Sequence, residues 1–235
     1  MKARTPVRAV AIVSATLMFA GHPLAEAREQ FPQRPVVVVP GIMGSKLCRL
    51  EEDGSRTVVW GTLGAVLRFS ELRLGGSEEP AHPCGLIREM SYLGIYTQDL
   101  YAPFLDRLEE AGYREGTTLL TFDYDWRRSV FDNAARLDAF VKRSMPDGGK
   151  VDIVAHSMGG LIARAYILRE GGTSRVNSLI TAGSPWRGAV RILQMLENGW
   201  GKANFVFGGL DEFRRIVLSF PAIFDLMPAY DSCCE

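Results

Sequence analysis

The sequence predicts an α/β fold in which a mostly parallel sheet is covered by helices on both faces. Four consecutive valines, residues 36–39, lie between prolines and are typical of a strand that is buried on both sides. Further along the chain, short apolar segments alternate with helical patterns of about a dozen residues. This alternation is typical of right-handed βαβ units, and it therefore predicts a parallel sheet.

The expected elements follow one another along the chain. Residues 33–40 form the first strand, and residues 41–91 are expected to be irregular, as in a lid or binding loop. The pattern then predicts, in order, a helix over 97–111, a strand over 118–122, a helix over 133–144, a strand over 151–154, a helix over 158–170 and a strand over 178–181. Beyond Pro185 the pattern is helical and irregular.

Residues 1–27 have the composition of a secretory signal. Basic residues at positions 2, 4 and 8 precede an apolar stretch, residues 9–20, and Ala25-Glu26-Ala27 fits the small residues before a cleavage point. The apolar stretch has 12 residues, whereas a membrane-spanning helix needs roughly 20. We therefore expect an exported protein, secreted or periplasmic, with a mature part, residues 28–235. An uncleaved membrane anchor is the alternative.

The charge balance and the cysteines limit the classes of partner. Lysine plus arginine equal aspartate plus glutamate at 27 each, so a nucleic-acid partner is not expected. Cysteine and histidine do not occur at metal-ligand spacing, and we expect no metal and no cofactor. In an exported chain four cysteines permit disulfides, and we expect Cys48 to pair with Cys84. The partners of Cys233 and Cys234 stay open.

Ser157 is the candidate nucleophile. It lies in the sequence AHSMG, between a predicted strand and a predicted helix, and fits the small-x-Ser-x-Gly pattern of a nucleophile elbow. Small residues two before and two after the serine allow strand and helix to approach closely, although Ala155 stands where glycine is commoner. The alternative is that Ser157 only caps the helix that follows it.

Acyl transfer at a serine also needs donors for the negative charge that develops on the carbonyl oxygen. In this type of site one donor is the N–H of the residue after the nucleophile, here Met158. The loop after the first strand, PGIMG at residues 40–44, offers the second donor at Ile42. The alternative for this loop is an ordinary glycine turn.

Several segments together resemble the lecithin:cholesterol acyltransferase family, which includes lysosomal phospholipases and phospholipid:diacylglycerol acyltransferases. They occur in the family's order and cover most of the mature chain. They are PVVVVPGIMGSKL (35–47), DLYAPFLDRLEEAGY (99–113), FDYDWRRS (122–129), AHSMGGLIAR (155–164), TAGSPWRGA (181–189) and FPAIFDLMP (220–228). The resemblance implies an α/β-hydrolase fold and a serine that takes an acyl chain from a glycerolipid and passes it to an alcohol or to water.

The resemblance also implies roles for particular positions. Ser157 would be the nucleophile, and the Ile42 and Met158 amides would form the oxyanion hole. The Cys48–Cys84 disulfide would close a lid within an insertion at about 45–91, and the cap region would begin in residues 190–235. Trp60 would contact the acyl chain or leaving group, or only pack within the lid.

Two further implications concern the scaffold and the partners. Asp123, Asp125, Trp126 and Arg127 would form a structural corner, with Arg127 paired to a carboxylate. The expected partners are a lipid substrate and a membrane or lipoprotein-like surface, and the oligomeric state stays open.

The chain departs from the expected pattern in its catalytic base. In an α/β-hydrolase the acid and then the histidine follow the serine, but no histidine follows Ser157 here. His156 adjoins the serine on a sharp turn, His82 lies upstream between prolines, and His22 would leave with the signal, so none is expected to be the base. The downstream candidates for the acid are Asp211, Asp225 and Asp231.

We therefore expect the N-terminal part of a longer hydrolase, incomplete at its C-terminus, with an apolar sheet edge exposed. Two alternatives stay open. One is a generic exported serine esterase of the same fold, and the other is a catalytically inactive, lipid-binding pseudoenzyme.

Overall fold

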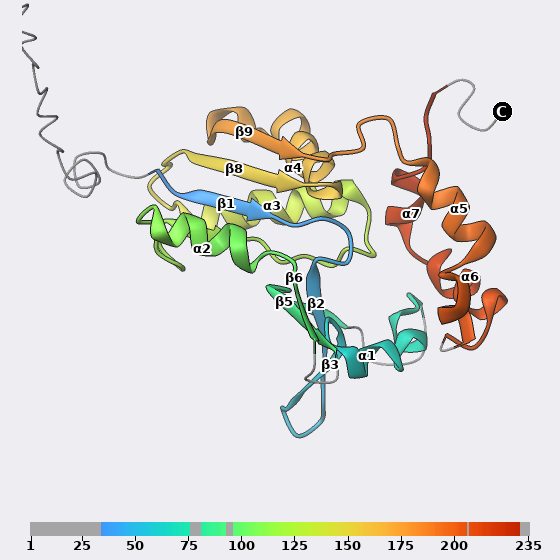
Figure 1. Cartoon of the computed structure of the whole chain (residues 1–235). Coiled ribbons are helices and arrows are strands. Elements are labelled where there is room, and N and C mark those ends of the chain that lie inside the picture. Colours follow the sequence, from blue (N-terminus) through green and yellow to red (C-terminus); the bar gives the residue numbers. More distant parts are fainter. Residues whose placement is uncertain (1–33, 76–80, 93–95, 206, 231–235) are drawn as a thin grey trace, which may run out of the picture. The chain divides into compact units, whose positions relative to one another are not determined.

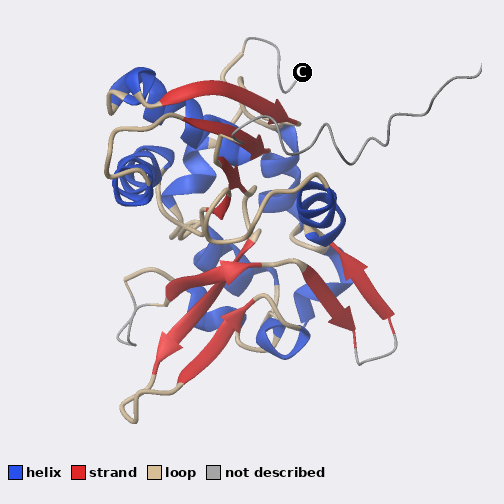
Figure 2. Cartoon of the chain, turned by 90° about the vertical axis from the view of Figure 1, so that its left-hand side faces the viewer, coloured by secondary structure: helices blue, strands red, loops and turns tan. Residues whose placement is uncertain are grey.

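A four-stranded parallel sheet forms the centre of the described structure, a computed structural model that covers residues 34–75, 81–92, 96–205 and 207–230 (Figures 1 and 2). Its spatial order is β7-β1-β8-β9, and all neighbours pair in parallel. The strands are β1 (Val36–Val39), β7 (Leu119–Thr121), β8 (Val151–His156) and β9 (Val176–Ala182). The expectation of a parallel sheet is confirmed. The signal predicted over residues 1–27 lies outside the described residues, as do His22, Asp231, Cys233 and Cys234.

Helices cover both faces of this sheet, as expected. Helix α2 (Ala102–Glu110) packs through Leu105 against Val36 and Val38 of β1. The alternate valines of β1 face helices α3 (Val130–Ser144) and α4 (Met158–Arg169) on the other side. The helix expected from residue 133 begins at Val130, because the Ser129 hydroxyl accepts a hydrogen bond from the Asp132 amide and caps the helix there.

Strand β9 is the outer strand of the described sheet, next to β8. Its Ile180 is 60% exposed. The sheet edge in the described part of the chain is therefore partly apolar.

Residues 45–99 contain regular strands and short helices in their described parts, 45–75, 81–92 and 96–99, and the expectation of an irregular excursion over 41–91 is wrong. Strands β2 (Ser45–Leu50), β3 (Arg56–Trp60) and β4 (His82–Leu86) form an antiparallel sheet in the order β3-β2-β4. The 3₁₀ helix η2 (Phe69–Leu72) and the short helix α1 (Leu63–Val66) follow β3, and β5 (Glu89–Tyr92) pairs with β6 (Tyr96–Asp99). Register shifts in both pairings of β2 break the alternation that would have revealed these strands.

A disulfide and a strand pairing order this inserted segment, residues 45–99. A disulfide joins Cys48 in β2 to Cys84 in β4, with an S–S distance of 2.03 Å. Residues 96–99 pair with β5, and α2 therefore begins at Ala102 and not near residue 97, with a proline in its first turn.

Short helices follow β9 and lie beyond the carboxyl ends of the parallel strands (Figure 1). They are the 3₁₀ helix η4 (Gly201–Phe205) and helices α5 (Val190–Asn198), α6 (Leu210–Val217) and α7 (Pro221–Asp225), while the 3₁₀ helix η3 (Gly172–Ser174) precedes β9. The inserted segment contacts them, since Leu74 N donates to Ser219 Oγ at 3.0 Å. Within the described ranges, no helix combines the length and apolar character needed to cross a bilayer.

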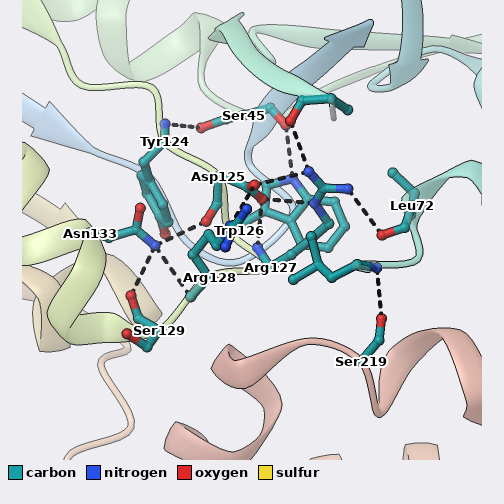
Figure 3. Close-up of polar contacts among 12 residues, drawn as sticks. Ser45, Leu72, Tyr124, Asp125, Trp126, Arg127, Arg128, Ser129, Asn133 and Ser219 are labelled. Atoms are coloured by element: carbon teal, nitrogen blue, oxygen red, sulfur yellow. Dashed lines mark hydrogen bonds and ion pairs between the residues drawn. The ribbon is translucent and has the colours of Figure 1, made fainter. Parts of the chain in front are cut away.

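A buried ion pair connects the loop after β7 to the inserted segment (Figure 3). Arg127 donates from Nε and Nη2 to the two carboxylate oxygens of Asp125, at 2.8 and 2.9 Å. The same guanidinium donates to the carbonyl oxygens of Leu72 and Ala81, at 3.0 and 2.9 Å. The expected pairing of Arg127 with a carboxylate is confirmed, and the pair also holds both ends of the segment between η2 and β4.

Two glycines allow α4 to begin close to β1 and to the loop after β9. A Cβ atom at Gly159 would overlap the carbonyl oxygens of Val39 and Pro40, and a Cβ atom at Gly160 would overlap Ser184 Oγ. Gly159 therefore sets how closely the start of α4 approaches the end of β1, and Gly160 sets how closely it approaches the loop after β9.

Replacing Arg127 with glutamine should lower the free energy of unfolding by about 3–5 kcal/mol, because the buried Asp125 carboxylate loses its main cation. Arg107→Gln is the matched control, since the Arg107–Glu110 pair is exposed and its loss should cost at most about 0.5 kcal/mol. Urea unfolding followed by tryptophan fluorescence measures both variants. Equal midpoints for the two variants would contradict this account.

Replacing Gly159 with alanine should also destabilise the protein, by about 1–3 kcal/mol, because the added Cβ collides with backbone atoms of β1. The control is Gly64→Ala in α1, where a Cβ meets no atom within 4 Å, and stability should stay the same or rise by up to about 1 kcal/mol. Thermal unfolding compares the two. A Gly159→Ala variant as stable as Gly64→Ala would show that the close approach is not constrained.

Candidate active site

Ser157 lies on a strained turn between β8 and α4. Its backbone has φ 53° and ψ −125°, a conformation that non-glycine residues rarely adopt, and its N–H donates to Ala182 O at 2.8 Å. The Ser157 side chain makes no capping hydrogen bond to α4. The arrangement is therefore that of a nucleophile elbow, in which the strain presents the hydroxyl at the end of the strand.

The loop after β1 makes a tight turn beside this serine. Gly44 N donates to Gly41 O at 3.1 Å, and Met43 adopts φ 65° within the turn. Trp60 Nε1 donates to Met43 O at 3.0 Å and holds the turn from the side of the inserted segment. Ile42 and Ser157 line the same cavity. Met158 is the first residue of α4, where helix N–H groups have no partner within the helix.

The cavity that contains Ser157 has a volume of about 880 Å³, within the range of ligand sites. Its walls are mainly apolar and come from the inserted segment, α5, α6 and α7. Prominent apolar residues of the lining are Phe69, Ile192, Met195, Trp200, Phe213 and Phe220, and polar residues of the lining include Arg191, Gln194 and Glu197. The Phe69 and Phe213 rings stack at 5.5 Å between centroids. A cavity of this kind suits an alkyl chain.

Trp60 lies beneath the loop and not in the wall of the Ser157 cavity. Its ring is 5% exposed and packs on Trp126 at 5.4 Å between centroids. It lines a second, smaller hollow of about 440 Å³, which shares Ile42 and Met43 with the cavity of Ser157. Of the two roles open to Trp60, the geometry supports packing.

The two described histidines lie outside the Ser157 cavity. The hydroxyl of Tyr101 lies 2.8 Å from His156 Nδ1, in the second hollow. Partial burial of the ring lowers the pKa of His156. His82 is the exposed first residue of β4, opposite Cys48 of β2, and not part of an irregular loop.

The downstream carboxylates that the structure describes have other partners. Asp225 accepts a hydrogen bond from Val130 N at 2.7 Å and so holds the start of α3. Asp211 is exposed and pairs with Arg214 at 3.5 Å. In the described ranges, therefore, neither a histidine nor one of these aspartates completes a triad with Ser157. These ranges also contain no group of three or more histidine, cysteine or acidic side chains that could hold a metal.

The sequence did not single out the aromatic side chains that line the Ser157 cavity, here called the aromatic wall. It also did not single out the two tyrosines that hydrogen-bond to the loop after β1. Phe69 lies far from Trp200 and Phe213 in the sequence, and only the fold shows that the three face one cavity. Tyr101 and Tyr124 hydrogen-bond to Gly41 and Pro40 of the loop. In the sequence, the two tyrosines could be noticed only because they lie in segments 99–113 and 122–129, which resemble the family.

The central sheet with helices on both faces and Ser157 on the turn into α4 is the α/β-hydrolase arrangement. Among solved structures, the chain is similar to that of the Tle4–Tli4 complex, with 18% identity, a TM-score of 0.47 and coverage of 85% of this chain and 55% of that chain. It is also similar to the mature form of Bacillus licheniformis lipase BlEst2, with 16% identity, a TM-score of 0.40 and coverage of 83% and 57%.

Curated relatives include phospholipase A(1) LCAT3 of Arabidopsis thaliana, 31% identical over 52% of this chain and 30% of the relative. The lysosomal phospholipase A and acyltransferase of Homo sapiens is 30% identical over 37% of this chain and 23% of the relative. The matches thus span less than a third of the length of these two relatives. Residues 83–234 match the family model described as lecithin:cholesterol acyltransferase. Because this match covers more than half of the chain, the protein belongs to the lecithin:cholesterol acyltransferase family.

Proposed function

We propose that Ser157 is the nucleophile of a lipid acyl transfer. In this reaction the serine takes a fatty acyl group from a glycerolipid ester and passes it to an alcohol or to water. The observation that carries the proposal is the position of Ser157, on a strained turn that opens into a large apolar cavity beside the loop after β1. Membership of the family supports the same class of reaction.

The chemistry follows from this position. Ser157 Oγ attacks the ester carbonyl carbon and loses its proton to a base, while the carbonyl oxygen becomes negatively charged. The N–H groups of Ile42 and Met158 would stabilise that oxygen, and one such donor is worth roughly 10²–10³ in rate. The bond to the glycerolipid oxygen then breaks, and that oxygen takes the proton from the base and leaves as a hydroxyl group. The oxygen of an alcohol or of water then attacks the acyl-serine, which releases an ester or a fatty acid and returns the proton to Ser157.

The substrate class is proposed from the cavity and the relatives. An alkyl chain in contact with Phe69, Phe213 and Ile223 would leave water, and each buried CH₂ contributes about 0.8 kcal/mol. The names of both relatives described above include phospholipase. We therefore propose that the substrate is a long-chain lipid ester and not a short soluble ester. The protein would bind this substrate at a membrane or lipoprotein-like surface.

We also propose that the base and its acid partner lie outside the described residues. His82 and His156 do not line the Ser157 cavity, and loss of the base removes most of the contribution of a triad, about 10⁴-fold or more. The 235-residue chain should accordingly turn over slowly. The position of both described histidines outside the Ser157 cavity also favours the alternative of a lipid-binding protein without catalysis. The disulfide between Cys48 and Cys84 supports export to an oxidising compartment.

Labelling with matched alkyl fluorophosphonates tests the proposal. A hexadecyl probe should label Ser157 at least about 10-fold faster than an ethyl probe, because the longer chain fills the apolar cavity. Labelling should be slow at neutral pH and should keep rising with pH, since neither of the described histidines lines the Ser157 cavity to accept the serine proton. Intact-protein and peptide mass spectrometry measure rate and position.

Ser157→Ala should abolish this labelling. The matched control is Ser184→Ala, because Ser184 carries a buried hydroxyl that has no hydrogen-bond partner in the described structure. Faster reaction with the ethyl probe would favour a generic esterase, and absence of any adduct at Ser157 would favour the lipid-binding alternative. Rapid labelling at neutral pH would show that the chain already contains a base.

A further inference from the structure

One peptide group at the start of the loop after β1 is held by two tyrosine hydroxyls. Tyr124 Oη donates to Pro40 O at 2.8 Å, and Gly41 N donates to Tyr101 Oη at 2.9 Å. Pro40 O and Gly41 N belong to the same peptide unit. Tyr124 belongs to the core between the sheet and α3 and α4, whereas Tyr101 packs with the core under α2. The peptide is therefore held from both faces of the sheet.

The hydroxyl of Tyr101 has a second partner, His156 Nδ1, at 2.8 Å. A phenol hydroxyl has one proton and can also accept, so Tyr101 can accept from Gly41 and still donate its proton to His156 Nδ1. Burial raises the pKa of Tyr101, and the phenol is thus protonated at neutral pH. In the tautomer of the neutral ring that carries its proton on Nε2, His156 Nδ1 accepts this bond from Tyr101.

These two bonds connect the two halves of the candidate site. His156 directly precedes Ser157, and Gly41 directly precedes Ile42. The halves are also in close contact, since a Cβ atom at Gly41 would lie 2.9 Å from Ser157 Cβ and 3.1 Å from His156 Nδ1. A shift of Gly41 would therefore move the Ile42 amide relative to the serine, and stabilisation of an oxyanion depends on that geometry.

We propose that Tyr101 is a positioning residue that joins the loop carrying Ile42 to the turn carrying Ser157 through its single hydroxyl. The proposal rests on the function proposed above for Ser157. Tyr101 lines the second hollow and not the cavity of Ser157, and it acts on the reaction through Gly41 and His156.

The test replaces Tyr101 with phenylalanine, which removes the hydroxyl and keeps the ring. Hydrogen exchange of the Gly41 amide should become about 3- to 10-fold faster, and the ¹⁵N resonance of His156 Nδ1 should shift, because both groups lose their partner. With the hexadecyl fluorophosphonate, the labelling rate at saturating probe should fall about 3- to 10-fold, while the probe concentration for half-maximal rate stays the same.

Tyr166→Phe is the matched control. The Tyr166 hydroxyl is buried without a hydrogen-bond partner among the described residues, and its removal should leave all of these readouts unchanged. The ¹⁵N resonances of His156 in the wild-type chain provide a second measurement. They should show a neutral ring that carries its proton on Nε2.

Two results would overturn the inference. One is an unchanged Gly41 exchange rate and His156 resonance in Tyr101→Phe, and the other is a change in both with an unchanged saturating rate. Absence of a Ser157 adduct in the wild-type chain would instead refute the proposed function. The Gly41 and His156 readouts would still decide whether Tyr101 holds the loop.

Discussion

The close approach of α4 to the end of β1 is the constraint on which the candidate site depends. The carbonyl oxygens of Val39 and Pro40 occupy the space that a side chain at position 159 would need, and Gly41 similarly faces Ser157. Because of this contact, the strained serine and the loop with Ile42 share one cavity. Neither Gly159 nor Gly41 has a positive φ, so glycine at these positions is required by packing and not by turn geometry.

The surrounding elements keep α4 against β1, and they do so with a pair of buried charges. Arg127 and Asp125 are nearly inaccessible to solvent, and burying their charges is unfavourable unless the pair is fully hydrogen-bonded. Here the guanidinium also satisfies the carbonyl groups of Leu72 and Ala81. The pair thus orders the inserted segment, whose Phe69 forms part of the apolar wall and whose Trp60 holds Met43.

The parallel sheet and the elbow could be predicted because their signals are local. A run of valines buried on both faces and a serine between small residues are visible in the sequence itself. The antiparallel strands of the inserted segment were missed because bulges disturb their alternation. The aromatic wall could not be predicted, since Phe69 and Phe213 meet only after α6 packs beside the inserted segment. Tyr101 was likewise visible only as part of a segment, because its role depends on Gly41 and His156.

A crystal structure of the hexadecyl phosphonate adduct at Ser157 would test the central claim most directly. The account predicts that the phosphonyl oxygen lies within hydrogen-bond distance of the Ile42 and Met158 amides. It also predicts that the alkyl chain enters the cavity lined by Phe69 and Phe213. A phosphonyl oxygen that points away from both amides, or a chain that occupies the hollow beside His156, would contradict it.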